Sequence, residues 1–284
     1  MTASSKIADT APGLHPLLRG LLEKSCPAVM GVLNVTPDSF SDGGQFLAAD
    51  RALEQARRLI AEGCDIIDIG AESTRPYGGM APISAEEELA RLRPVLAKVV
   101  ALGVPVSIDS LKPEVTAFAL DQGAVIANDV WGLQREPDMA ALVAARNCPV
   151  VVMHNRNRAD PAIDIIKDIA TFFARSLEMA ERAGVPRENI VLDPGIGFGK
   201  TAEQSMTALA RLDEFSSFGL PLLVGASRKR FIASVVPSTP QQRLGGSIAA
   251  HVIAAQRGAR IIRTHDVADT VQALRIAAAI EEKR

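Results

Sequence analysis

Short apolar segments alternate with helical segments along this chain, and this alternation constrains the fold more than any other feature. Eight apolar runs are typical of buried strands, at residues 28–35, 65–69, 104–108, 124–127, 149–153, 190–192, 221–224 and 259–262. Strands that alternate with helices form parallel sheets through right-handed crossovers. Eight such units within 284 residues predict an α/β fold, a single closed (β/α)8 TIM barrel, rather than an open doubly wound sheet.

The helices and the domain limits follow from the same pattern. We expect the main helices at residues 86–102, 137–146, 163–183, 202–212 and 267–280. No Pro/Ser-rich linker or shift in composition divides the chain, so one domain is predicted. We place the barrel at residues 28–284 and interpret residues 1–27 as an N-terminal tail and lead-in.

The composition argues against several classes of binding partner. A net charge of −2 and an aromatic content of 4% do not favour nucleic-acid binding. No apolar run approaches the length of a membrane span, and residues 1–10 lack the apolar core of a secretory signal. Cys26, Cys64 and Cys148 are far apart and have no metal-binding spacing. We therefore expect a cytoplasmic protein that binds neither nucleic acid nor membrane.

Polar residues follow every predicted strand, at the end of a barrel where active sites lie. In chain order they are Asn34; Glu72, Ser73, Thr74 and Arg75; Asp109; Asn128 and Asp129; His154 and Asn155; Asp193; Ser227, Arg228 and Lys229; and Arg263, His265 and Asp266. Asn and Asp side chains can hydrogen-bond a flat heterocycle, whereas Arg, Lys and His suit a polyanion. The set predicts a ligand with a polar ring and a phosphate.

Each of these residues also has a purely structural interpretation. Asp193 precedes a proline and could start a turn, and the pair Asn128–Asp129 could cap a helix. His154 or His265 alone could be a packing residue, and residues 227–230 could form a solvated face or a helix start. The structural interpretations do not predict that polar residues stand at all eight strand ends, which favours a common site.

The glycine-rich stretch Asp193–Thr201 resembles a phosphate-binding loop in part. Its end, Gly199-Lys-Thr201, fits the Walker A pattern, but Pro194 stands where the first glycine is required. Proline lacks the backbone amide that such a loop offers to phosphate. The stretch therefore does not favour a phosphate-loop nucleotidase, and we interpret Lys200 as a loop or helix-start residue.

Taken together, these segments resemble the dihydropteroate synthases. The matching segments are Gly31–Gly44, Asp68–Pro76, Val106–Asp109, Asn128–Asp129, Met153–His154, Asp193–Lys200, Ser227–Lys229 and Arg263–His265. The motifs of the first, second and sixth strands are long and specific, and all occur in the family's order from about Val29 to the C-terminus.

The resemblance implies a transferase of folate biosynthesis on a (β/α)8 barrel. Such an enzyme joins 6-hydroxymethyl-7,8-dihydropterin diphosphate to 4-aminobenzoate, and it releases 7,8-dihydropteroate and pyrophosphate. The resemblance also implies Mg²⁺ as cofactor, an SN1-like loss of pyrophosphate, a homodimer built from the late helices, and sulfonamides as inhibitors. The run Gly245–Ala250 is rich in small residues that would permit close packing between subunits.

The family's residue roles carry over to matching positions. The resemblance assigns pterin binding to Asp109, Asn128, Val130, Met153, Asp193 and Lys229. Pyrophosphate binding falls to Asn34, Arg263 and His265, with Asn34 also holding Mg²⁺. The aminobenzoate would lie among Thr74, Arg75, Pro76, Phe198 and Lys229. The catalytic set implied is Asp109, Lys229, Arg263, Asp42 and Arg75, with Asp42 and Arg75 in loops that close over the site.

Two other functions remain as alternatives. A pterin-dependent methyltransferase on a similar barrel has no use for a pyrophosphate site, so Arg263-Thr-His265 and the long first loop disfavour it. A non-catalytic pterin-binding module predicts the loss of a loop or leaving-group residue, and none is missing. The chain departs from the family pattern at Ser110, Asn155, Tyr77 and Arg230. The last two would alter the aminobenzoate pocket and hence the sulfonamide response.

Overall fold

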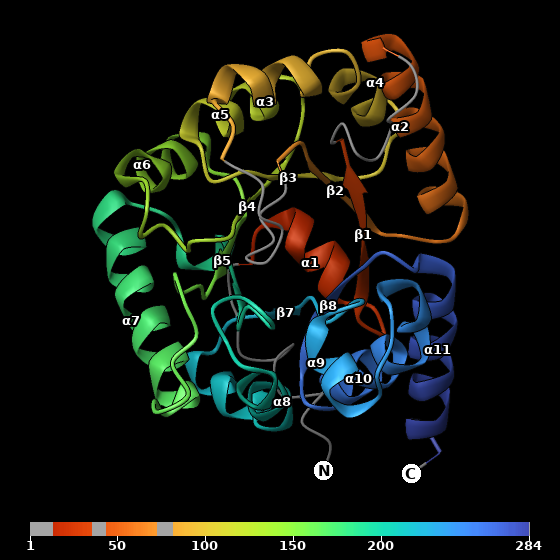
Figure 1. Cartoon of the computed structure of the whole chain (residues 1–284). Helices are drawn as coiled ribbons and strands as arrows, with labels where there is room; N and C mark the ends of the chain where they lie inside the picture. Colours follow the sequence, from red (N-terminus) through yellow and green to blue (C-terminus); the bar gives the residue numbers. More distant parts are fainter. Residues whose placement is uncertain (1–13, 36–43, 73–81, 284) are drawn as a thin grey trace.

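A closed parallel barrel forms the centre of the molecule, as predicted. The computed structural model describes residues 14–35, 44–72 and 82–283 (Figure 1). The strands are β1 (Ala28–Asn34), β2 (Ile66–Gly70), β3 (Val106–Asp109), β4 (Ile126–Asp129), β5 (Val150–Met153), β6 (Ile190–Asp193), β7 (Leu222–Val224) and β8 (Ala259–Thr264). Within the described ranges they pair in sequence order, and β1 closes the barrel by pairing in parallel with β8.

Helices surround the barrel, and one of them lies across its end (Figure 1). They are α1 (Pro16–Leu22), α2 (Gly44–Ala61), α3 (Ala85–Leu92), α4 (Leu96–Val100), α5 (Pro113–Asp121), α6 (Pro137–Arg146), α7 (Ile165–Ala183), α8 (Ala202–Ala210), α9 (Arg230–Val235), α10 (Leu244–Gln256) and α11 (Val267–Glu281), with 3-10 turns at Arg187–Asn189, Leu212–Phe218 and Pro240–Gln242. The helix predicted at 86–102 is in fact two, because Pro94 cannot donate the backbone hydrogen bond that a continuous helix needs. None of the described helices is long and apolar enough to cross a bilayer.

Alternation along the strands decides which side chains enter the barrel. In β2, Ile66 belongs to the cluster inside the barrel, whereas Ile67 and Ile69 pack among the surrounding helices. Because successive side chains of a strand point to opposite faces, Asp68 faces the interior. The same alternation in β8 places Ile261 inside, Ile262 outside and Arg263 inside. The interior is therefore apolar at one end and polar at the carboxyl end of the strands.

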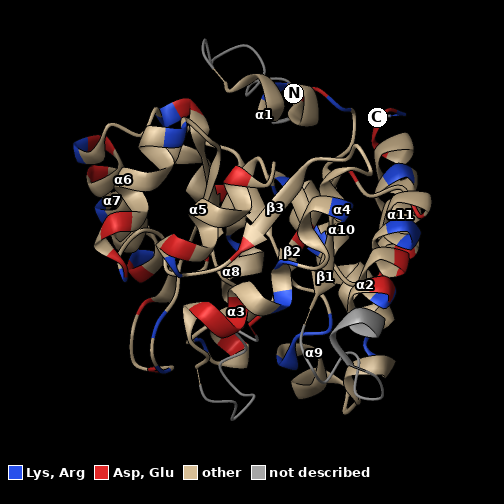
Figure 2. Cartoon of the chain, turned by 90° about the horizontal axis from the view of Figure 1, so that it is seen from above, with Lys and Arg blue, Asp and Glu red and all other residues tan. Residues whose placement is uncertain are grey.

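Helix α1 closes the apolar end of the barrel, a feature that the sequence pattern does not predict. Leu18 and Leu21 are buried and pack with interior residues of the strands, such as Met30 and Ile126. Arg260 of β8 donates hydrogen bonds to backbone carbonyls at the end of this helix. Figure 2 shows α1 at the opposite end of the barrel from α9. With one end sealed, the polar end is the side open to a ligand.

The observed end of β4 corrects the predicted strand limits. The sequence pattern predicts the fourth strand at 124–127, but it runs from Ile126 to Asp129. Asn128 and Asp129 are therefore the last residues of the strand, and alternation sends their side chains to opposite faces. Asp129 accepts hydrogen bonds from the amides of Trp131 and Leu133 at 2.8 and 2.7 Å, so it orders the following loop. Of the two residues, Asn128 is the one that faces the barrel interior.

Candidate active site

Arg263 is the centre of a buried polar layer near the carboxyl ends of the strands. Its Nε donates to Asp68 Oδ2 at 2.6 Å, and its Nη2 donates to Asp109 Oδ2 at 2.7 Å. Asn128 Nδ2 donates to Asp68 Oδ2 at 3.2 Å. Four strands, β2, β3, β4 and β8, thus contribute to one hydrogen-bonded layer. Its members come from positions up to 195 residues apart in the chain.

The electrostatics of this layer favour a ligand that donates hydrogen bonds. Burial is the main cause that raises the pKa of the Asp109 carboxyl, and the nearby Asp68 carboxylate adds to the rise, whereas the Arg263 guanidinium opposes it. Asp109 Oδ1 is buried and has no hydrogen-bond partner among the described residues. A buried acceptor without a donor costs free energy, so a ligand N–H that reaches Asp109 Oδ1 would be stabilised.

Asp193 supplies a second buried carboxylate to the same interior. It is the last residue of β6, and burial raises the pKa of its side chain to about 6 despite the cations Lys229, Lys200 and Arg263. Its Oδ1 accepts a hydrogen bond from the amide of Gly195 at 2.7 Å. That bond begins the turn expected of an Asp-Pro pair. The structural and the functional interpretations of Asp193 are therefore compatible, because a carboxylate has further acceptor positions for a ligand.

Apolar side chains line the space beside these carboxylates. Val130, Met153 and Phe198 form a separate buried cluster, against which Leu111 and Trp131 pack. The Lys229 ammonium lies 3.9 Å from the centroid of the Phe198 ring, a cation–π contact. Carboxylates at the edge and apolar groups on the faces suit a flat, nitrogen-rich ring.

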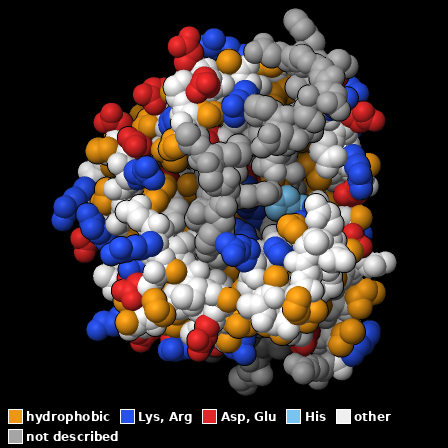
Figure 3. Space-filling model, viewed as in Figure 1, with side chains coloured by type: hydrophobic (Ala, Val, Ile, Leu, Met, Phe, Trp, Pro, Cys, Tyr) orange, Lys and Arg blue, Asp and Glu red, His pale blue; other side chains and the backbone are white. Residues whose placement is uncertain are grey.

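Of the predicted phosphate residues, Arg263 belongs to the polar layer, and Asn34 and His265 lie at the ends of the neighbouring strands β1 and β8. Asn34 ends β1 and is half-buried, and His265 follows β8 with its amide and Nδ1 at 3.2 and 3.0 Å from Ser227 Oγ. Figure 3 shows Lys, Arg and His side chains gathered near the centre of this face. The predicted residues Asp42, Thr74, Arg75, Pro76 and Tyr77 lie outside the described ranges.

The structure adds one residue to the site that the sequence interpretation misses. Asp68 is fully buried and holds both Arg263 and Asn128. It escapes a search of strand ends because it lies within a strand. A usable signal is present, since a carboxylate within the run Ile66-Ile-Asp-Ile69 has no place in an apolar core unless it is paired.

The glycine-rich stretch is not a phosphate-binding loop. Thr201 is the N-cap of α8, and its hydroxyl accepts from the amide of Gln204 at 3.1 Å, while the Gln204 side chain accepts from the Thr201 amide at 3.0 Å. This capping box occupies the Thr201 hydroxyl, the group with which a Walker A loop would hold the metal. Lys200 lies in the loop before the helix, as predicted, but its side chain is buried.

We expect Thr201→Ala to lower the free energy of unfolding by about 1 kcal/mol, the usual cost of a lost N-cap. The same substitution should leave the affinity for inorganic pyrophosphate unchanged, because the hydroxyl is committed to the helix. Urea denaturation and titration calorimetry measure the two quantities. A loss of pyrophosphate affinity without loss of stability would return Thr201 to a phosphate-binding role.

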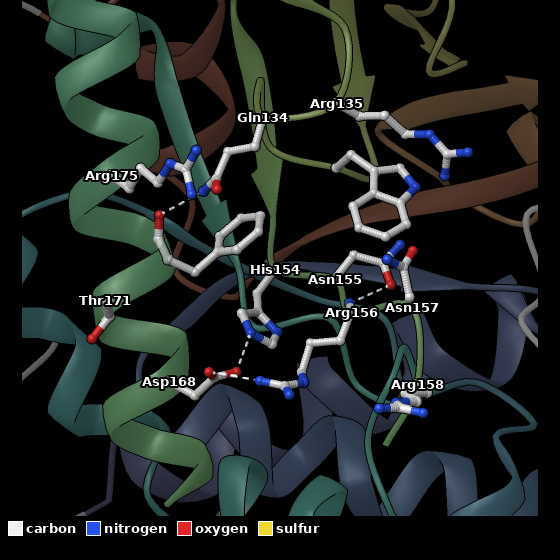
Figure 4. Close-up of a pocket in the computed structure, with 12 residues that line it drawn as sticks. Gln134, Arg135, His154, Asn155, Arg156, Asn157, Arg158, Asp168, Thr171 and Arg175 are labelled. Carbon is white, nitrogen blue, oxygen red and sulfur yellow. Dashed lines mark hydrogen bonds and ion pairs between the residues drawn. The ribbon is translucent and has the colours of Figure 1, made fainter. Parts of the chain in front are cut away.

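A second opening lies outside the barrel, between the loops after β4 and β5 and helix α7. It has a volume of about 850 Å³, and Arg135, Arg156, Arg158 and Arg175 are among its lining residues. Asp168 of α7 accepts hydrogen bonds there from His154 Nε2 at 3.0 Å and from Arg156 at 2.7 Å (Figure 4). This groove borders the outer side of His154, whereas the carboxylates of the polar layer lie inside the barrel.

Fold and site together define a class of protein, the (β/α)8 barrels that hold a small polar molecule among buried side chains at the carboxyl ends of their strands. The buried carboxylates and apolar walls suit a flat heterocycle. A family model described as "Pterin binding enzyme" matches residues 30–265. The chain belongs to the pterin binding enzyme family.

Relatives with closely similar sequences share this barrel. The dihydropteroate synthase of Bacillus subtilis is 43% identical over 260 residues, which is 91% of this chain and 90% of the relative. A crystal structure of a Clostridium difficile dihydropteroate synthase in the presence of pteroic acid is 44% identical, with a TM-score of 0.86 over 90% of this chain and 97% of that chain. A Xanthomonas albilineans dihydropteroate synthase with 4-aminobenzoic acid is 43% identical, with the same TM-score over 90% of this chain and 93% of that chain.

One relative is much longer than this chain. A probable bifunctional folylpolyglutamate synthase/dihydropteroate synthase of Haloferax volcanii is 45% identical over 258 residues. These residues make up 89% of this chain but 30% of that relative.

Proposed function

We propose that this protein is a dihydropteroate synthase. The observation that carries the proposal is the buried layer of Asp68, Asp109, Asn128 and Arg263, with Asp193 beside it. This layer lies beside the apolar cluster of Val130, Met153 and Phe198. The chain is also 43–45% identical to relatives named as dihydropteroate synthases. The reaction joins 6-hydroxymethyl-7,8-dihydropterin diphosphate and 4-aminobenzoate to give 7,8-dihydropteroate and pyrophosphate.

The pterin ring is proposed to lie between the carboxylates and the apolar cluster. Its N–H groups would donate to Asp193 and to Asp109 Oδ1, while Asn128 and Lys229 contact its other polar edge. Val130 and Met153 would cover its faces. The unpartnered Oδ1 of Asp109 supports this arrangement, because it is an acceptor that the described residues leave without a donor.

Pyrophosphate and magnesium are proposed to bind at the mouth, near Asn34, Arg263 and His265. Mg²⁺ commonly takes one or two protein oxygens and completes its octahedron with substrate phosphates and water. The Asn34 side-chain oxygen would supply one such ligand to a magnesium ion that arrives with the diphosphate. Bound Mg²⁺ would neutralise charge on the departing pyrophosphate.

The chemistry needs no protein nucleophile. The bond between the pterin methylene and the diphosphate oxygen breaks, and its electron pair leaves with pyrophosphate. The amine nitrogen of 4-aminobenzoate then forms a bond to the methylene and loses a proton to solvent. Asp109 and Asp193 would offset the positive charge that develops on the pterin, while Arg263 and His265 would stabilise the leaving group. Lys229 and Phe198 would contact the aminobenzoate, together with the resemblance-assigned residues Thr74, Arg75 and Pro76, which lie outside the described ranges.

Release of pyrophosphate tests the proposed function directly. The protein is incubated with the dihydropterin diphosphate, 4-aminobenzoate and Mg²⁺, and pyrophosphate is measured with time. We expect steady release that requires all three components. Binding of the pterin without turnover would instead indicate a pterin-binding module. Omission of 4-aminobenzoate is the internal control, because simple hydrolysis of the diphosphate would continue without it.

The protein is also proposed to be a homodimer built from the late helices. Ile253 of α10 and Ile276 and Ile280 of α11 are 45%, 59% and 64% exposed, although they are large apolar residues. Helices α10 and α11 pack against each other, so these side chains lie on neighbouring elements. Sedimentation equilibrium of the wild type and of Ile280→Glu tests this. A monomeric wild type would contradict the proposed interface.

A further inference from the structure

Lys200 is buried beneath the loop that carries Phe198, and its ammonium group makes three hydrogen bonds. It donates to His154 Nδ1 at 2.6 Å, to the carbonyl of Gly195 at 2.8 Å and to the carbonyl of Phe198 at 3.2 Å. A lysine ammonium has three N–H donors, and these three acceptors match them. The side chain is only 2% exposed, so it is part of the interior rather than of the loop surface.

His154, which accepts a hydrogen bond from Lys200, makes a second hydrogen bond through its other ring nitrogen. His154 is fully buried, and burial lowers the pKa of its imidazole to about 4, so the ring is neutral near neutral pH. A neutral ring has one donor and one acceptor nitrogen. Nε2–H donates to Asp168 of α7, which leaves Nδ1 as the acceptor for Lys200. The ring of Phe172 packs against the imidazole edge to face, with the two ring centroids 4.9 Å apart.

The loop rests directly on the end of β5. Gly195 and Gly199 have φ angles of 63° and 54°, and a Cβ at either position would lie within 2.0–2.4 Å of the backbone oxygen of His154 or Arg156. The amide of His154 also donates to the carbonyl of Asp193 at 2.8 Å. The glycines thus permit the close approach, and Lys200 fixes the loop from below.

We propose that Lys200 is a positioning residue that sets where Phe198 stands in the proposed aminobenzoate pocket. The chain of contacts runs from Asp168 through His154 and Lys200 to the carbonyl of Phe198. The ring of Phe198 in turn carries the cation–π contact with Lys229. Because Lys200 is buried under the loop, it acts through the loop rather than on the substrate. The inference deepens the proposed function and rests on it.

The position of Asp193 should depend less on Lys200 than the position of Phe198 does. Asp193 belongs to strand β6 and pairs with Met153 of β5, so the barrel holds its backbone independently of the loop. Phe198 lies in the loop, and the described backbone bond that ties its amide runs to Gly195 within the same loop. Loss of Lys200 should therefore weaken aminobenzoate binding more than pterin binding.

Steady-state kinetics of Lys200→Met test the inference, because methionine keeps an apolar stem of similar length but donates no hydrogen bond. We expect KM for aminobenzoate to rise about tenfold, as for the loss of one hydrogen bond to a charged group. The dissociation constant for the pterin, measured by calorimetry, should rise much less. Equal losses for both substrates, or an unchanged KM for aminobenzoate in a folded variant, would overturn the inference.

A milder variant keeps the test decisive if Lys200→Met does not fold. Asp168→Asn removes the charge at the half-exposed end of the chain of contacts, and KM for aminobenzoate should rise in the same direction by a smaller factor. Thr171→Ala, one turn along α7, is its matched control, because the Thr171 hydroxyl donates to its own helix at the Lys167 carbonyl. A KM in Asp168→Asn equal to that in Thr171→Ala contradicts the proposed role.

General instability of the barrel is separated from the role of Lys200 by a substitution away from the site. Val143→Ala removes two methyl groups from the buried face of α6 and destabilises the barrel. If instability were the cause, Val143→Ala would raise KM for aminobenzoate as well, and the inference would fail. The wild type is measured first. Absence of pyrophosphate release from the wild type would contradict the proposed function. A wild type with normal release and a Lys200→Met variant with an unchanged KM for aminobenzoate would contradict only the role of Lys200.

Discussion

Arg263→Ala is expected to lower the free energy of unfolding by about 3–5 kcal/mol, the cost of removing one partner from a buried ion pair. Arg263 holds Asp68 and Asp109 at 2.6 and 2.7 Å, and both carboxyl groups are buried. Without the guanidinium, two carboxylates face each other in a medium of low dielectric. They can escape this repulsion by taking up a proton, so the loss of stability should be smaller at lower pH.

The same substitution should also abolish most of the catalysis. The resemblance to the dihydropteroate synthases assigns Arg263 to the leaving pyrophosphate, which predicts that turnover falls more than pterin affinity. The structure adds a loss of pterin affinity to that expectation, because Arg263 also orders Asp109 and, through Asp68, Asn128, which are proposed pterin contacts. We expect pterin affinity and turnover both to fall, with turnover falling further. Calorimetry with the pterin and the rate of pyrophosphate release measure the two losses.

Arg260→Ala is the matched control, since Arg260 lies on the same strand at the other end of the barrel. It donates hydrogen bonds to backbone carbonyls of Leu22 and Lys24, so its loss should cost stability without affecting the site. If Arg260→Ala slows turnover as much as Arg263→Ala does, the effect comes from general instability. A stable and fully active Arg263→Ala would show that the buried layer is not needed for catalysis.

The barrel could be predicted from sequence because its strands and helices leave distinct apolar periods along the chain. Helix α1 could not, because its seven residues are too few for a clear helical period and its partners are strands spread over the whole chain. The break between α3 and α4 was predictable in principle, since Pro94 stands in the middle of the predicted helix. The position of α1 is decided by long-range packing, which no local pattern reveals.

The candidate site also has a part that the sequence predicts and a part that it does not. Asp109, Asn128 and Asp193 end parallel strands, so the fold alone brings them to one mouth, and the sequence predicts their proximity. The pairing of Arg263 with Asp68 and Asp109 depends on how far each strand is staggered around the barrel, which no local pattern gives. For the same reason the sequence places Lys200 in a loop or at a helix start without its interior contacts, although three acceptors surround its ammonium group.

Asp193→Ala is expected to weaken pterin binding by about 1–3 kcal/mol, the range for stranding buried hydrogen-bond partners. The carboxylate is 5% exposed, so a pterin N–H that loses this acceptor would be left without a partner in a buried place. Stability should change less than binding. The Gly195 amide loses its acceptor, but burial of an anion is avoided at the same time. Calorimetric titration with a pterin measures the affinity, and an unchanged affinity would remove Asp193 from the site.

The pH dependence of pterin binding tests whether binding needs the negative charge of Asp193 or only a side chain of that size at that position. Burial raises the pKa of this carboxyl to about 6, and only the ionised form accepts hydrogen bonds at both oxygens. Burial also raises the pKa of the Asp109 carboxyl, to about 7. Affinity should therefore fall as the pH drops through 7 and then through 6, because protonation of Asp109 and then of Asp193 removes acceptors. In Asp193→Asn that position no longer titrates, so the acid limb should be shallower, with Asp109 as the remaining buried carboxyl whose pKa is raised. An acid limb of the same steepness in the wild type and in Asp193→Asn would mean that another group controls pterin binding.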